Sequence, residues 1–174
     1  PLDPRVRTFP GALREAGYHT AHRGESHLQN MGSSPAQLAK EMPALPPYDA
    51  RDEGHSDGWD QHESLARNAT EYASIPDEYH GVSQVELSVG HADVCTGHYF
   101  HRAKKKGVDL SKLRGAANAI EVSNPAFHVW RTAVPEAVYP TTYITERTQS
   151  YLQDHAATRS TEPFFTVCSF PDPH

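Results

Sequence analysis

The stretch that most constrains the fold is TFPGALREAGYHTAHRGESHLQN, residues 8–30. It predicts a short amphipathic helix over residues 9–16, ended by Gly17, and then a strand over residues 18–23. Gly24 breaks this strand and places the residues that follow on a loop at its carboxyl end. Ligands of open α/β sheets bind at that edge, so the polar residues of this loop are the first candidates for a functional site.

Three later segments carry a regular pattern. Residues 82–89 (VSQVELSV) alternate in hydropathy as a strand does, and residues 142–157 keep a helical period. The run 164–170 is continuous and apolar between two prolines, which is typical of a buried parallel strand. Shorter helices are expected over 61–72 and from about Tyr99. This order of elements predicts an α/β fold with a small, mostly parallel sheet, flanking helices and long loops.

A long loop is expected over residues 31–60, with one helical turn around 35–41 and Ser34 as its N-cap. A loop of this length inside a compact domain is usually functional or disordered. Its end, EGHSDGWDQHES, is dense in potential cation ligands: Glu53, His55, Asp57, Asp60, His62 and Glu63. These residues fit either a cation-binding loop or a solvated polar loop.

The segment GYHTAHRGESHL resembles the second signature of the sulfatases in the alkaline phosphatase superfamily, G-Y-x-T-x-x-x-G-K-x-H. Glu25 stands where that pattern has lysine, and the matching residues are Gly17, Tyr18, Thr20, Gly24 and His27. The segments VELSVGHADVCTGHY (85–99) and EPFFTVCSFPDPH (162–174) resemble later parts of the same family, particularly of its arylsulfatase and phosphonate monoester hydrolase branch. The resemblance implies a single truncated, sulfatase-like domain over residues 1–174.

The same resemblance shows what the chain lacks. Members of the family attack with a formylglycine made from cysteine, or with serine or threonine, in a C/S-x-P-x-R motif. They bind metal through two further pairs of residues that contain aspartate. These motifs are not found here, and neither Cys95 nor Cys168 lies in such a context. We therefore expect an internal fragment whose open sheet edges are completed by pairing with other copies, as a homodimer or larger homo-oligomer.

The first candidate site follows from this resemblance. In sulfatases the GKxH lysine and histidine converge on the substrate anion with the histidine of a later P-x-H motif, and the corresponding residues here are Glu25, His27 and His174. A carboxylate repels an anionic ester, but one carboxylate with two imidazoles is the ligand set of a Zn²⁺ hydrolase. We therefore predict all three as catalytic, His27 and His174 as substrate contacts, and Glu25 and His27 as metal ligands. Alternatively, Glu25 and His27 are vestigial surface groups.

Twelve histidines favour a metal site without locating it. A second candidate has the spacing H-x-D-x4-H-x2-H, with His91, Asp93, His98 and His101 on a glycine-containing loop that runs into a helix. Three N or O ligands can be gathered there within a turn or two, so His91, Asp93 and His98 are predicted metal ligands. The GHxD and GHY elements also look familial, which supports the alternative of hydrogen-bonded structural histidines.

Three functions stay open at this point. The first is a metal-dependent hydrolase of phosphate esters, most of all phosphodiesters, in which a Zn²⁺-activated water replaces the missing nucleophile. The second is a catalytically inactive sulfatase remnant that self-associates and binds metal incidentally. In the third, a partner chain supplies the missing motifs and restores sulfatase chemistry.

Composition restricts the partners of this chain. The net charge of -6 argues against nucleic-acid binding. No apolar run approaches the roughly 20 residues of a membrane span. We expect a soluble, cytoplasmic protein that acts on a small anionic ester, without nucleic-acid or membrane partners.

Overall fold

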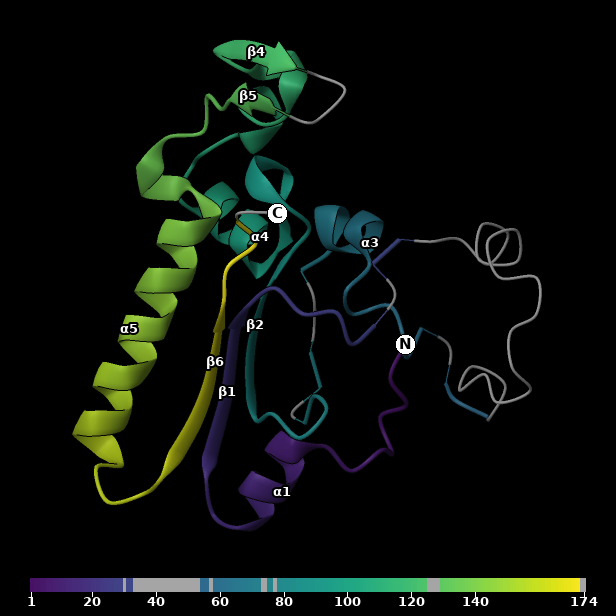
Figure 1. Cartoon of the computed structure of the whole chain (residues 1–174), viewed down its shortest axis with the longest axis vertical. Coiled ribbons are helices and arrows are strands. Elements are labelled where there is room, and N and C mark those ends of the chain that lie inside the picture. The colour runs from purple at the N-terminus through teal and green to yellow at the C-terminus, as the bar shows by residue number, and fades with distance from the viewer. Residues whose placement is uncertain are drawn as a thin grey trace.

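A four-stranded sheet, in the order β3-β2-β1-β6, forms the centre of the molecule (Figure 1). The central strand β1 (His19–Gly24) pairs in parallel with β2 (Gln84–Val89) on one side and with β6 (Phe164–Ser169) on the other. The short β3 (Thr96–Gly97) joins β2 in antiparallel orientation. The predicted α/β class with a small, mostly parallel sheet is therefore confirmed. The computed structural model describes residues 1–29, 31–32, 54–56, 58–72, 75–76, 78–124 and 129–172.

Two helices flank this sheet on opposite faces. The first, α1 (Phe9–Glu15), packs the ring of Phe9 edge-on against Phe165, with 5.5 Å between ring centroids. The long α5 (Pro140–Thr158) lies over the other face, where the hydroxyl of Thr148 donates to Cys168 Sγ. Since successive strand residues point to opposite faces, Phe165 and Cys168 mark the two sides. Within the described ranges, no helix is long and apolar enough to cross a membrane.

The remaining elements surround the carboxyl ends of the parallel strands. They comprise two short helices, α3 (Leu65–Thr70) and α4 (His98–Lys105), and a hairpin of β4 (Glu121–Asn124) and β5 (Val129–Arg131). Single 3₁₀ turns connect them, at Ala92–Val94, Leu110–Lys112, Ala116–Asn118 and Glu136–Val138. The helical turn predicted at 35–41, with Ser34 as its cap, lies outside the described residues.

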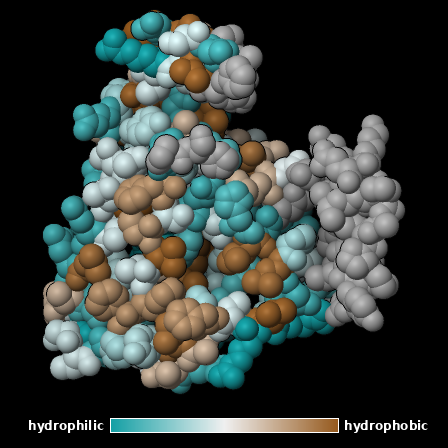
Figure 2. All heavy atoms as spheres, viewed as in Figure 1, coloured by the Kyte–Doolittle hydropathy of each residue, from teal (hydrophilic) through white to brown (hydrophobic). Residues whose placement is uncertain are grey.

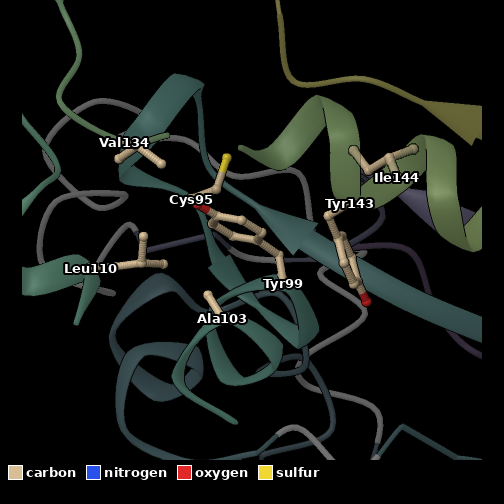
Figure 3. Close-up of a cluster of buried hydrophobic side chains, with 7 residues drawn as sticks. All are labelled: Cys95, Tyr99, Ala103, Leu110, Val134, Tyr143 and Ile144. Carbon is tan, nitrogen blue, oxygen red and sulfur yellow. The ribbon is translucent and has the colours of Figure 1, made fainter. Parts of the chain in front are cut away.

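The main apolar cluster lies where α4 and α5 approach each other (Figure 3). Its members are Cys95, Tyr99, Ala103, Leu110, Val134, Tyr143 and Ile144. Burial raises the pKa of the Cys95 thiol to about 12. This thiol therefore stays protonated at neutral pH and is a packing residue, because the thiolate is the nucleophilic form.

The run 164–170 forms the predicted parallel strand, β6, but the prediction that this strand is buried is wrong. Strand β6 is the outer strand of the sheet, and the side chains of Phe164 and Phe170 are 44% and 41% exposed. An apolar run indicates that a strand has covered faces, but it does not tell a central strand from an edge strand. On the face shown in Figure 2, hydrophobic residues gather over the lower part of the molecule, where Figure 1 places α1 and the start of β6.

Candidate functional site

Three of the predicted residues meet at the carboxyl ends of β1 and β2: Glu25, His27 and His91. Glu25 directly follows β1, and His91 lies two residues beyond the end of β2. The Oε1 atom of Glu25 is 3.3 Å from Nε2 of His27 and 3.2 Å from Nδ1 of His91. The two imidazole rings lie roughly parallel, 26° apart in plane, with 6.4 Å between centroids. Residues predicted for two separate sites therefore share one carboxylate.

This cluster combines a buried anion with accessible imidazoles. The Glu25 side chain is only 9% exposed, whereas those of His27 and His91 are 61% and 41% exposed. Within the described part of the chain, Glu25 Oε1 accepts no hydrogen bond of good geometry. A buried carboxylate is costly unless it is paired or hydrogen-bonded. The two imidazoles are thus the groups placed to compensate its charge, and solvent reaches them.

The backbone of Glu25 is held from two sides. Its N–H donates to the carbonyl of Ser169 at the end of β6, at 3.0 Å, and its carbonyl accepts from His22 Nε2 at 2.9 Å. Burial lowers the pKa of His22, so the neutral ring is favoured in this position. Gly24 has a φ of 114°, and a Cβ there would overlap the Ser169 carbonyl. Glycine is therefore required for the strand to deliver Glu25 at this point.

The loop that carries His27 is anchored by Glu63, one of the predicted cation ligands. The Glu63 side chain is fully buried, and its carboxylate accepts hydrogen bonds from the Tyr79 hydroxyl at 2.5 Å and from the backbone N–H groups of Leu28 and Gln29. Burial, together with the charge of Glu63, raises the pKa of Tyr79. These bonds use the Glu63 oxygens to fix the loop next to His27.

The other potential cation ligands predicted in the segment EGHSDGWDQHES make contacts within the fold. His55 stacks on the ring of Trp59, with 4.1 Å between centroids, and its Nε2 lies 3.5 Å from a carboxylate oxygen of Asp3. Asp60 accepts from the side-chain amide of Gln61, and His62 lies edge-on to Tyr79. Glu53 and Asp57 lie outside the described residues.

Asp93, a predicted metal ligand, ties the β4–β5 hairpin to the rest of the fold. Its side chain is fully buried. Its Oδ2 atom accepts three hydrogen bonds, from the backbone N–H of Gly115, Nε1 of Trp130 and the hydroxyl of Thr132. Three donors on one carboxylate oxygen are typical of a structural anchor.

His98 and His101 also make hydrogen bonds that support the fold. Nδ1 of His98 accepts from the backbone N–H of Leu87 at 3.0 Å, and burial lowers the pKa of this ring. Nε2 of His101 donates to the carbonyl of Glu71 at 2.7 Å and is also 3.1 Å from the carbonyl of Asn68. His98 thus links α4 to β2, and His101 links α4 to α3.

The donor types at Glu25 are those of a zinc site. Zinc bonds of about 2.0–2.1 Å in tetrahedral geometry separate neighbouring ligands by roughly 3.3–3.4 Å, close to the two separations around Glu25. Among the residues that the structure describes, however, no group of three or more His, Cys, Asp or Glu side chains is arranged to hold a metal ion. Binding an ion would therefore require His27, the most exposed member, to adjust. His174, predicted as the third member, lies outside the described residues.

Sequence reasoning missed a further carboxylate, Glu86, which is partly buried on the face of β2 that α5 covers. Its oxygens accept from Arg147 at 2.7–2.9 Å and from the Tyr143 hydroxyl at 2.7 Å, and Arg23 Nε lies 3.5 Å away. Burial alone would raise the pKa of Glu86, but hydrogen bonds from Arg147 and Tyr143 outweigh it, so the pKa is lowered. A charged residue inside an apolar, alternating strand was the available signal. A cavity of about 370 Å³ lies beside this network.

No protein-family model, curated protein or solved structure matches this chain. The sulfatase resemblance stays a hypothesis carried by sequence motifs. The functional argument therefore depends on the geometry around Glu25.

Proposed function

We propose that this protein is a zinc-dependent hydrolase of phosphate esters, with Glu25, His27 and His91 as its site. One observation carries the proposal: among the described residues, a buried carboxylate oxygen without a hydrogen bond lies within 3.3 Å of one nitrogen from each of two imidazoles, whose side chains are 61% and 41% exposed. This group stands at the carboxyl ends of parallel strands, where α/β proteins bind ligands. When bound, Zn²⁺ would supply positive charge and a water of lowered pKa.

Glu25 and His27 have distinct roles in this proposal. Glu25 supplies the negative charge that holds both imidazoles toward one point, because Nε2 of His27 and Nδ1 of His91 both face its Oε1. His27, the most exposed of the three, contacts the substrate anion. His174 stays the predicted second anion contact.

Electrostatics favours phosphodiesters among the possible esters. A diester carries one negative charge, whereas a phosphate monoester carries close to two at neutral pH. The Glu25 carboxylate repels the dianion more strongly than the monoanion. We therefore expect faster turnover of bis-4-nitrophenyl phosphate than of 4-nitrophenyl phosphate.

The test combines metal analysis with activity. The full chain is equilibrated with zinc, its bound metal is measured, and turnover of bis-4-nitrophenyl phosphate is followed with and without a chelator. Glu25→Gln and His91→Asn should each lower zinc affinity by about 10- to 100-fold or more, as removal of metal-site groups does. The matched control is Glu71→Gln, the same substitution at an exposed glutamate that forms an ion pair with Arg67.

Two results would contradict the proposal. Turnover that the chelator leaves unchanged would exclude the metal mechanism. Zinc binding that survives in both Glu25→Gln and His91→Asn would exclude this site.

A second candidate is a catalytically inactive sulfatase remnant that self-associates and binds metal incidentally. The buried, protonated Cys95 and the exposed edge of β6 favour it, since neither a nucleophile of the family type nor a closed sheet is found in the described residues. A defined oligomer that shows no turnover with any divalent ion would support this candidate over the hydrolase.

A further inference from the structure

The outer edge of β6 carries backbone groups that have no partner among the described residues. In a parallel ladder, alternate residues of a strand direct both their N–H and C=O groups to the same neighbour. The carbonyls of Pro163 and Ser169 both accept from β1, so the odd-numbered residues of β6 face β1. Phe164, Thr166 and Cys168 therefore direct their N–H and C=O groups away from the sheet, and no hydrogen bond to these groups occurs within the described ranges.

In contrast, the edge on the β2 side of the sheet is largely covered. The same alternation makes the odd-numbered residues of β2 face outward. The outward N–H of Leu87 donates to Nδ1 of His98, and Val89 pairs with Thr96 of β3. Side chains and a short strand thus occupy most of the β2 edge. Among the strands that the structure describes in this sheet, β6 alone offers a continuous row of hydrogen-bonding groups at an edge.

The sequence of β6 does not protect this edge. Residues 164–170 (FFTVCSF) contain no charge and no proline, although natural edge strands are usually blocked by lysine, proline or a bulge. The side chains of Phe164 and Phe170 at its two ends are exposed. Such an edge is a template for another strand.

We propose that β6 pairs with β6 of a second copy of this chain, antiparallel about a two-fold axis at Val167. This register places Thr166 opposite Cys168 of the second copy and brings Phe164 of each copy beside Phe170 of the other. The two four-stranded sheets then join into one continuous sheet. The argument for this interface does not rest on the hydrolase activity proposed above, and it gives the predicted homo-oligomer a specific geometry.

Three features identify the occupant as a second copy. The outward groups of Thr166 and Cys168 satisfy each other in this register, because opposite residues of an antiparallel pair exchange both hydrogen bonds. A neutral strand places no like charges opposite each other. The blocked β2 edge prevents the heterologous β6–β2 contact that would build a filament, so assembly stops at a closed dimer.

The first test blocks the outer edge of β6 and keeps the hydrogen bonds between β6 and β1. In Thr166→Pro the lost N–H is the one that faces outward, and proline is tolerated on edge strands in this orientation. We expect the wild-type chain to sediment as a dimer and Thr166→Pro to raise the dimer dissociation constant by at least about tenfold, or 1.4 kcal/mol. Thr166→Val keeps the N–H and the branched side chain and should stay dimeric. Circular dichroism verifies that both variants are folded.

The second test uses the wild-type chain and its own cysteines. Cys168 is exposed, whereas Cys95 is buried with a pKa raised to about 12, so a thiol reagent reacts at Cys168. In the proposed register the two Cys168 residues are diagonal neighbours, about 7–8 Å apart, and a short bismaleimide should link two chains. Cys168→Ser should abolish the link. A monomeric wild-type chain, a dimer that Thr166→Pro leaves intact, or a dimer that cannot be linked through Cys168 would each overturn the proposal.

Discussion

Two carboxylates on the same sheet, Glu25 buried and Glu86 partly buried, have opposite surroundings. Glu86, under α5, accepts from Arg147 and Tyr143, so both of its oxygens are occupied. Glu25, at the end of the neighbouring strand, has an oxygen that accepts no hydrogen bond from the described residues, and two imidazoles lie beside it. The first carboxylate is part of the structure that holds α5 on the sheet. The second is the one we propose as a binding group, because two partly exposed imidazoles face its charge.

The largest expected effect tests the structural half of this comparison. Glu86→Gln removes the charge that balances Arg23 and Arg147 under α5. We expect the free energy of unfolding to fall by roughly 3 kcal/mol, the lower end for a broken buried pair, because the Glu86 side chain keeps 20% exposure. Urea unfolding measures this loss. Glu71→Gln, on an exposed pair, should change stability by less than about 0.5 kcal/mol, and equal effects of the two changes would contradict the structural role.

A smaller effect is expected from acid. The pKa of His98 is lowered by burial, so the unfolded chain, with a histidine pKa of about 6.5, binds this proton more readily. Stability is therefore full above pH 6.5 and is lost as the pH falls below that value. Glu86, whose lowered pKa also stabilises the fold, contributes to this loss only below about pH 4.3.

The melting temperature at pH 7 and pH 5 measures this loss. Each kcal/mol corresponds to about 2–4 °C in a chain of this size. In His98→Asn, an amide oxygen can accept from the N–H of Leu87 without titrating, so the difference between the two pH values should shrink. An unchanged difference would show that other groups, such as the buried His80, carry the acid sensitivity.

The smallest effect tests the other carboxylate. Glu25→Gln removes a buried charge that lacks a hydrogen bond, so we expect the free energy of unfolding without metal to change by less than about 0.5 kcal/mol. In the presence of zinc, only the wild-type chain should gain stability, because a ligand that binds the native state raises its melting temperature. A loss of several kcal/mol without metal would place Glu25 with Glu86 as a structural residue.

Local patterns predicted the elements well because their signals are short-range. The helix at 9–16, ended by Gly17, is observed as α1, and the strand at 18–23 is observed as β1, one residue later. The helical period over 142–157 marks α5. Each of these depends on caps, glycines and periodic apolar residues that are visible in the sequence.

Contacts between residues that are far apart in the sequence were harder to predict. Glu25 and His91 are brought together only because β1 and β2 are adjacent and parallel, which the sequence does not specify. His98 and Asp93 have the spacing of ligands, yet their hydrogen-bond partners, Leu87 and Thr132, are set by the chain around them. The edge position of β6 could not be read from its composition, because central and edge strands can share the same apolar run.

The bond from the Glu25 N–H to the Ser169 carbonyl joins the candidate site to the strand proposed as an interface. Through this hydrogen bond, a shift at the end of β6 also shifts the backbone of Glu25. Pairing of two copies and binding of an ion at the site are therefore thermodynamically coupled wherever one of them moves the end of β6. Such coupling is reciprocal. An ion that tightens association of two copies must be held more firmly by the associated form, by the same factor.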